Sequence, residues 1–162
     1  MFFNSHSYIS SLVYEPKYHG KREQGEIIGE LMAQYHQSFH FFDDIDVIIP
    51  LPISTKRSWQ RGYNQSNLLA HGISLRTGIT VDNEVVKRNT FVKSQTHLSP
   101  TERRENVRDA FQLINKERIK GKHLLLVDDV VTTGATIIAC AQELAKAEGV
   151  RISVLSVGFT KD

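Results

Sequence analysis

One stretch constrains this chain more than any other: residues 124–136, which read Leu-Leu-Leu-Val-Asp-Asp-Val-Val-Thr-Thr-Gly-Ala-Thr. Its four leading apolar residues predict a strand that is buried on both faces, because strands of a parallel sheet read as continuous apolar runs. Two adjacent acids, Asp128 and Asp129, follow where that strand is expected to end. A Thr/Gly loop then leads into an apolar, Ala-rich segment that predicts a helix from Thr136. This order puts the acids and the loop at the carboxyl end of a strand, where open α/β sheets bind ligands.

The loop has the chemistry of a phosphate site. Backbone N–H groups at the start of a helix are unpaired donors at the positive end of a dipole, and the threonine hydroxyls add further donors. Gly134 removes the side chain where the backbone must approach an anion. The two carboxylates are acceptors suited to sugar hydroxyls or to a hydrated divalent cation. The alternative is an ordinary strand-to-helix turn with two solvated acids.

Length and composition favour one globular domain. The chain has 162 residues, 40% of them hydrophobic and 23% charged, so we expect a single domain over residues 1–162, with the aromatic-rich residues 1–20 as an N-terminal arm. No apolar run approaches the roughly 20 residues of a membrane span, and no secretory signal is visible. The single cysteine, Cys140, excludes an internal disulfide framework and is expected to pack in the core. We therefore expect a cytoplasmic protein with no membrane insertion.

Charge is unevenly distributed along the chain. The formal net charge is only +2, yet residues 87–122 contain ten basic and four acidic side chains. A local excess of this kind attracts polyphosphate or nucleic acid. A solvated surface that is basic without a binding role is the alternative.

Apolar periodicity predicts strands that alternate with helices. Helices are expected over 26–35, from Gly62 to Gly78, over 101–107 and over 136–148, and strands over 46–53, 77–80, 84–87, 110–114 and 151–159, with a turn at residues 82–83. The apolar stripe of the first helix (Ile27, Ile28, Leu31, Met32 and Tyr35) is expected to pack in the core. The alternation predicts an α/β fold with a mostly parallel central sheet flanked by helices.

Residues 124–136 resemble, position by position, the phosphoribosyl pyrophosphate (PRPP) signature of type I phosphoribosyltransferases. The resemblance implies the type I phosphoribosyltransferase fold and a catalytic acid pair, Asp128 and Asp129, that contacts the ribose. It also implies a 5-phosphate loop formed by Val131, Thr132, Thr133, Gly134, Ala135 and Thr136.

Other parts of the site follow from the same resemblance. The loop after the first sheet strand contacts pyrophosphate in that family, which assigns Ser54, Lys56 and Arg57 to the diphosphate. A mobile loop is expected to close over the site, with Arg88, Lys93, Gln95, Arg103 and Arg104 in it. Mg²⁺ is the expected cofactor, carried by PRPP and not ligated directly by protein side chains.

Three further blocks narrow the resemblance to the competence protein F (ComF) family. They are Lys17-Tyr18-His19-Gly20, the run from Ile49-Pro50-Leu51-Pro52 through Arg61-Gly62-Tyr63-Asn64-Gln65, and the segment from Arg88 to Ala110-Phe111. Typical members begin with a four-cysteine zinc ribbon, which this sequence lacks. Either the ribbon was lost or the sequence starts after it, so functions carried by a ribbon are not assigned to this polypeptide.

The resemblance leaves several functions open. One is an enzyme that transfers a phosphoribosyl group from PRPP, or a related sugar phosphate, with pyrophosphate release. Another is a non-catalytic competence protein that handles single-stranded DNA during natural transformation, together with other competence proteins. In that case the basic middle of the chain would contact phosphates, and Trp59, Tyr63 and Phe91 would be candidates for base stacking, although ordinary packing suits them as well. A PRPP-sensing regulator is the third hypothesis.

Overall fold

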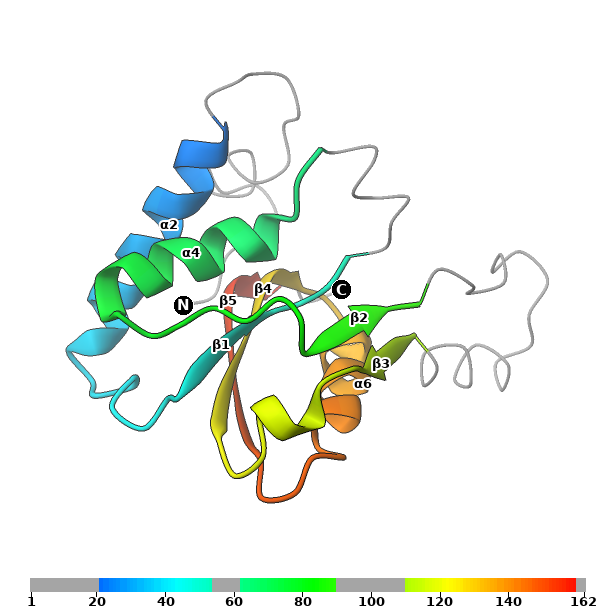
Figure 1. The fold of residues 1–162 in the computed structure, drawn as a ribbon. Helices are drawn as coiled ribbons and strands as arrows, with labels where there is room; N and C mark the ends of the chain where they lie inside the picture. The colour runs from blue at the N-terminus through cyan, green and yellow to red at the C-terminus, as the bar shows by residue number, and fades with distance from the viewer. Residues whose placement is uncertain (1–20, 54–61, 90–109, 160–162) are drawn as a thin grey trace.

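The computed structural model describes residues 21–53, 62–89 and 110–159, which form a parallel sheet with helices on both faces (Figure 1). The sheet contains β1 (Val47–Pro50), β4 (His123–Val131) and β5 (Arg151–Phe159) in the order β1-β4-β5. Both neighbouring pairs are parallel, with Ile48 opposite Leu125 and Leu125 opposite Ser153. The predicted α/β architecture with a parallel central sheet is confirmed for these residues.

Alternation along β1 and β4 divides the core into two layers. Ile48, Leu125 and Val127 pack toward α2 (Lys21–Gln37) and α4 (Gln65–Thr77) on one face of the sheet. Ile49, Leu124 and Leu126 pack on the other face, toward α6 (Ala135–Leu144). Because both faces are covered, the central strand is apolar without interruption from Leu124 to Val127, and all four residues have 0% of their surface exposed.

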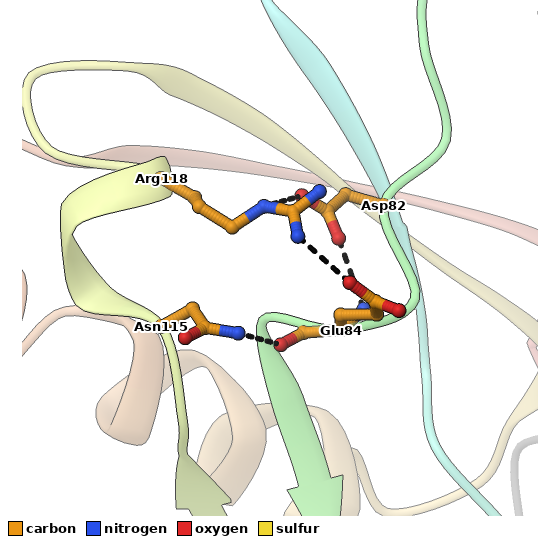
Figure 2. A network of polar contacts seen from close by, with 4 residues as sticks. All are labelled: Asp82, Glu84, Asn115 and Arg118. Carbon is orange, nitrogen blue, oxygen red and sulfur yellow. Dashed lines mark hydrogen bonds and ion pairs between the residues drawn. The ribbon is translucent and has the colours of Figure 1, made fainter.

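A small antiparallel pair, β2 (Val86–Arg88) and β3 (Phe111–Leu113), lies beside α6 on that second face (Figure 1). A polar network ties its base to the main sheet. The guanidinium of Arg118, which follows β3 in a short 3-10 turn (Lys116–Arg118), contacts Asp82 Oδ2 and Glu84 Oε2, both at 2.8 Å (Figure 2). The Asn115 side chain donates to the Glu84 carbonyl at 2.8 Å. Residue 81, next to this network, forms a parallel bridge with Ile48 of β1.

Helices α2 and α4 cross at glycines. A β carbon on Gly29 would collide with the backbone of Leu69 in α4, and one on Gly72 would collide with the backbone of Glu26 in α2. The two helices therefore pack backbone to backbone at this crossing, and the close approach depends on both glycines.

Part of the expected packing of the first helix is wrong. Ile28 and Met32 do pack against the core, but Ile27, Leu31 and Tyr35 are 54%, 59% and 63% exposed. The crossing with α4 uses the face of α2 that carries Gly25 and Gly29. That geometry leaves Ile27, Leu31 and Tyr35 exposed.

Several predicted boundaries also differ. The expected strand over 77–80 is not formed, since Gly78 caps α4 and only residue 81 bridges to β1. The chain does turn after Asp82, where the Glu84 N–H donates to Asp82 Oδ1 at 2.9 Å, but this turn does not join two paired strands. The second of those strands exists as β2 but pairs with β3. Helix α6 ends at Leu144 and not near residue 148, because turns occupy 145–149 and Gly149 adopts a φ of 70°.

The remaining element predictions stand as follows. The expected strands over 110–114 and 151–159 and the helix that ends at Gly78 are confirmed. The expected helix over 101–107 and the arm over 1–20 lie outside the described residues. Within the described ranges, no helix has the length and apolar character that crossing a bilayer requires.

Candidate functional site

The site begins where β1 ends and β4 continues. Pairing between the two strands stops at Pro50 and Val127, and the Leu51 N–H makes a last hydrogen bond to the Val127 carbonyl at 2.8 Å. Beyond that point β4 pairs with β5 alone, as far as Val131. The acids therefore lie within β4. The sequence had indicated that they follow the end of the strand, and this expectation is wrong. Their flank of the strand faces space that β1 has left open.

The start of α4 borders this space and is fixed by one side chain. Asn64 caps the helix by accepting a hydrogen bond from the Ser66 N–H at 3.2 Å. Its amide nitrogen donates in turn to the Leu51 carbonyl at 3.0 Å. The first of these bonds is the one expected of asparagine at a helix N-cap. The second joins the first turn of α4 to the chain that leaves β1.

Each acid uses one oxygen on the protein itself. Asp128 Oδ1 accepts from the Ser66 hydroxyl at 3.1 Å and from the Asp129 N–H at 2.9 Å. Asp129 Oδ1 accepts from the Val130 N–H at 2.7 Å. The two carboxyls also share a side-chain hydrogen bond, which requires that one of them is protonated. A ligand that favours the ionised pair would break this bond and leave carboxylate oxygens as acceptors.

Burial and the neighbouring acid change the charge of this pair. Desolvation, followed by repulsion from Asp129, raises the pKa of Asp128 from 3.8 to about 7. Near neutral pH, Asp128 is therefore protonated in a substantial fraction of molecules. A cation or a set of hydroxyl donors placed beside the pair would favour the ionised form.

The acids open into a cavity of about 320 Å³. Its walls come from the end of β1, the start of α4, β2, β4 and the start of α6. They comprise residues 51–53, residues 63–66, Arg88, residues 128–130, Thr132 and Thr136. The cavity therefore lies at the carboxyl edge of the sheet, in the position where open α/β folds bind ligands.

The predicted phosphate loop leads from β4 into α6 at the same cavity. Gly134 is the N-cap of α6 at a φ of 75°, a left-handed conformation that glycine adopts without strain. Thr132 and Thr136 line the cavity. Thr133 instead accepts a bond from the Ala135 N–H at 3.4 Å, and Val131 belongs to the end of β4 and packs against the core. The first N–H groups of α6 have no partner within the helix, as at any helix start.

The structure places only some of the other predicted site residues. Arg88 was expected in a mobile loop, but it ends strand β2, lines the cavity and lies over the Phe111 ring at 5.4 Å from the centroid. Residues outside the described ranges are Ser54, Lys56, Arg57, Lys93, Gln95, Arg103 and Arg104, together with the stacking candidates Trp59 and Phe91. Tyr63 is described and lines the cavity.

Sequence reasoning missed two residues of the site. Asn64 belongs to the block of residues 61–65 that supports the family resemblance, but no role was predicted for it. No role was predicted for Ser66 either. The available signal was an asparagine just before an apolar helix, which predicts an N-cap. Nothing in the sequence indicates that the Ser66 hydroxyl reaches Asp128, because 62 residues separate the two.

Cys140 packs in the core close enough to the site to be affected by the charge of Asp128. It is fully buried on α6, and burial followed by the charge of Asp128 raises the pKa of its thiol to about 12. The packing role expected for it is confirmed. Among the described residues, no cluster of three or more His, Cys, Asp or Glu side chains could hold a metal ion.

Comparison with known proteins identifies the family to which the chain belongs. The family model of the phosphoribosyl transferase domain matches residues 18–157. The chain belongs to that family. The sheet, the acid pair and the loop before α6 are thus elements of a phosphoribosyl transferase domain, and the type I phosphoribosyltransferase fold expected from the sequence is confirmed.

Curated relatives of this phosphoribosyl transferase domain are named as competence or DNA utilization proteins. Competence protein F of Haemophilus influenzae is 39% identical over 62% of this chain and 44% of its own length. DNA utilization protein YhgH of Escherichia coli K12 is 37% identical over 67% of this chain and 47% of its own. Competence protein ComFC of Bacillus subtilis is 31% identical over 80% and 52%. The resemblance to the ComF family is confirmed, and the chain spans about half the length of these relatives.

Solved structures extend the similarity in fold. Glutamine PRPP amidotransferase from Bacillus subtilis superposes with a TM-score of 0.60 at 20% identity, over 90% of this chain and 30% of that one. Adenine phosphoribosyltransferase from Saccharomyces cerevisiae gives 0.52 at 14% identity, over 88% and 70%. At these identities the likeness is one of fold.

Proposed function

We propose that this domain binds PRPP with Mg²⁺ and transfers its phosphoribosyl group to an acceptor, with release of pyrophosphate. The observation that carries the proposal is the hydrogen bonding of the acid pair at the edge of the cavity. One oxygen of each carboxylate is held by a hydroxyl or backbone donor of the protein. Ionisation of both acids breaks the hydrogen bond between the two carboxyls and leaves further acceptor oxygens for a ligand in the cavity that Thr132 and Thr136 also line. Two adjacent acceptors beside a helix start suit a sugar that carries hydroxyls and a phosphate.

Each group of residues has a defined part in this reaction. The N–H groups at the start of α6, with the hydroxyls of Thr132 and Thr136, hold the 5-phosphate. Asp128 and Asp129 accept hydrogen bonds from the ribose hydroxyls. Their negative charge also favours the oxocarbenium-like positive charge that develops when the bond at C1 breaks.

The residues present suit a Mg²⁺ ion that arrives with the diphosphate. Within the described part of the chain there is no preformed cluster of metal ligands. The paired carboxylates nevertheless carry the hard oxygen atoms that Mg²⁺ prefers, and they can accept hydrogen bonds from the waters around such an ion. When bound, the ion neutralises charge on the diphosphate leaving group. Asp128 and Asp129 are the residues that would face it.

Calorimetry with PRPP and Mg²⁺ tests the binding step. The double change Asp128→Asn plus Asp129→Asn should abolish measurable heat, because neutral amides neither attract the cation nor accept as strongly from hydroxyls. The matched control is Asp43→Asn plus Asp44→Asn, a second adjacent pair whose side chains are exposed just before the amino end of β1, whereas the cavity lies at its carboxyl end. Undiminished affinity in the first variant would remove the site.

Pyrophosphate release tests the transfer step. The wild-type domain should release pyrophosphate from PRPP when a suitable nucleophile is supplied from a panel of nucleobases and amines. The Asp128→Asn plus Asp129→Asn variant provides the background rate. Binding of PRPP with no release for any member of the panel would contradict transfer and leave binding intact.

Single-stranded DNA handling is a second candidate, favoured by the names of the curated relatives. Exposed lysines in the described segment before β4, Lys116 and Lys122, belong to the basic middle of the chain. If this region contacts phosphates, affinity for an oligonucleotide should fall steeply with salt, and replacing Arg103 and Arg104 by Gln should reduce the slope. An affinity that does not change with salt would contradict the candidate.

A further inference from the structure

We propose that Ser66, held in place by Asn64, is a positioning residue for the acid pair: its hydroxyl fixes one oxygen of Asp128 so that the other faces the sugar. The assignment rests on the proposed function for its consequence, but the contact itself is a property of the ligand-free domain. The proposal also gives a role to Asn64, a residue of the block 61–65 to which the proposed function assigns none.

The first argument is the burial and direction of the Ser66 hydroxyl. Ser66 is 2% exposed in the first turn of α4, where a serine side chain ordinarily bonds to its own backbone or to water. Here it donates to Asp128 Oδ1 at 3.1 Å, across 62 residues of sequence. A buried hydroxyl that reaches a carboxylate restricts the rotation of that carboxylate, because losing the bond would leave both groups desolvated and unpaired.

The second argument is the saturation of Asp128 Oδ1. The same oxygen also accepts the Asp129 N–H at 2.9 Å, so the two donors hold it from different directions. A carboxylate held at one oxygen by two donors has its second oxygen fixed in direction as well. Without Ser66, the bonds to Asp128 that remain come from the adjacent residue, from the Asp129 backbone N–H and the Asp129 carboxyl, and the bond that ties Asp128 to α4 is lost.

The third argument is the choice of asparagine at position 64. Serine and aspartate cap helices as well as asparagine does, but neither offers both an acceptor and an amide donor. Asn64 uses both, since its oxygen accepts from the Ser66 N–H and its nitrogen donates to the Leu51 carbonyl. The tether fixes the first turn of α4 against the end of β1, and therefore fixes where Ser66 lies relative to Asp128.

Titration of Asp128 in the ligand-free protein measures the contact directly. The charged and titratable groups near Asp128 are Asp129 beside it on β4, Arg88 of β2, which lines the same cavity, and Cys140 of α6, whose thiol is affected by the charge of Asp128. None of them changes in Ser66→Ala. Carboxyl ¹³C NMR, with the signal assigned through Asp128→Asn, should show the Asp128 pKa shifted upward in Ser66→Ala, because a donor to the ionised form is lost.

Matched variants separate positioning from general damage to α4. Ser74→Ala makes the same chemical change on the same helix and should leave the titration unaltered. Ser66→Cys keeps the size of the side chain with a weaker donor and should give an intermediate shift. An Asp128 titration that is the same in wild type and in Ser66→Ala would overturn the role of Ser66.

Asn64→Ser isolates the tether, because serine retains the helix cap but cannot reach the Leu51 carbonyl with a second group. It should shift the Asp128 titration in the same direction as Ser66→Ala, by a smaller amount. An unchanged titration in Asn64→Ser would reduce Asn64 to a helix cap and overturn that half of the proposal.

Ligand affinity connects the contact to function. If wild type binds PRPP with Mg²⁺, Ser66→Ala should weaken binding by about tenfold or more, the usual cost of a hydrogen bond to a charged group, while Ser74→Ala binds normally. Full affinity in Ser66→Ala would overturn the positioning role even if the titration had shifted. If wild type itself does not bind PRPP, the proposed function fails, and the NMR titration still decides whether Ser66 fixes Asp128.

Discussion

Gly72 of α4 lies directly against the backbone carbonyl of Glu26 in α2, with no room for a β carbon between the two helices. In an unconstrained helix, alanine would be better than glycine by about 0.5–1 kcal/mol. At this crossing the sign should reverse. Gly72→Ala should lower the free energy of unfolding by about 2–3 kcal/mol, because one helix must move away from the other.

Urea denaturation followed by circular dichroism measures that cost. Leu75→Ala is the control, since it removes a much larger side chain from a position on the same helix that is 61% exposed. It should change stability by less than about 0.5 kcal/mol. A Gly72→Ala protein as stable as wild type would mean that the helices do not cross as closely as described.

Asp128 should make the domain less stable as the pH rises. Its folded pKa of about 7 lies above the unfolded value of 3.8, so the folded state binds the proton more tightly. The contribution of Asp128 to the free energy of unfolding therefore falls between about pH 4 and pH 7 and is fully lost above that range. Asp128→Asn should be more stable than wild type by about 1–3 kcal/mol at pH 8, after allowance for partial solvent exposure.

The pH dependence supplies the control for that prediction. The difference in unfolding free energy between Asp128→Asn and wild type should shrink as the pH is lowered from 8 toward 4, measured by urea titrations at each pH. A difference that is constant with pH would show that Asp128 is not protonated in the folded domain near neutrality.

Gly134 should matter twice, for folding and for anion binding. Its φ of 75° makes Gly134→Ala unfavourable by about 1 kcal/mol even though a β carbon there would meet Ile138 and Val131 only at ordinary van der Waals distances. Gly78 has the same φ at the end of α4 and no part in the cavity. Thermal melts should show similar losses for the two alanine variants, whereas calorimetry with PRPP should show weaker binding only for Gly134→Ala. Equal affinities would separate the loop from the ligand.

Arg118 should be more important for stability than an exposed arginine usually is. It pairs with Asp82, whose side chain is only 10% exposed, so Arg118→Leu leaves a buried carboxylate with one partner fewer. We expect a loss of about 2–3 kcal/mol in unfolding free energy, measured by urea denaturation. Lys120→Ala breaks an exposed pair with Glu148 and should cost under about 1 kcal/mol. Comparable losses would mean that burial of Asp82 has no energetic consequence.

The sequence predicted the central elements because their signals are local. The uninterrupted apolar run at 124–127 predicts a strand covered on both faces, and Gly78 predicts the end of α4; both predictions are confirmed. The extension of β4 through the acids was not visible, because Asp128 and Asp129 are poor strand formers. Pairing with β5 as far as Phe159 keeps them extended in spite of that.

The failures have a common physical origin in contacts between distant segments. Ile27, Leu31 and Tyr35 have the spacing of a buried stripe, but the glycine crossing with α4 decides which face of α2 turns inward. Ser66 and Arg88 join the cavity only because β1 stops early and β2 packs beside α6. The roles of Asp128, Asp129 and the loop residues in ligand binding remain predictions.

The difference in length between β1 and β4 carries a consequence for variation in this fold. The cavity lies where β4 continues past the last residue that pairs with β1, so its position depends on where one strand stops. Two more paired residues on β1 would cover Asp128 and Asp129 with backbone. Insertions should therefore be tolerated on the outer turns of the domain and rejected at this single junction, where adding chain removes the space itself.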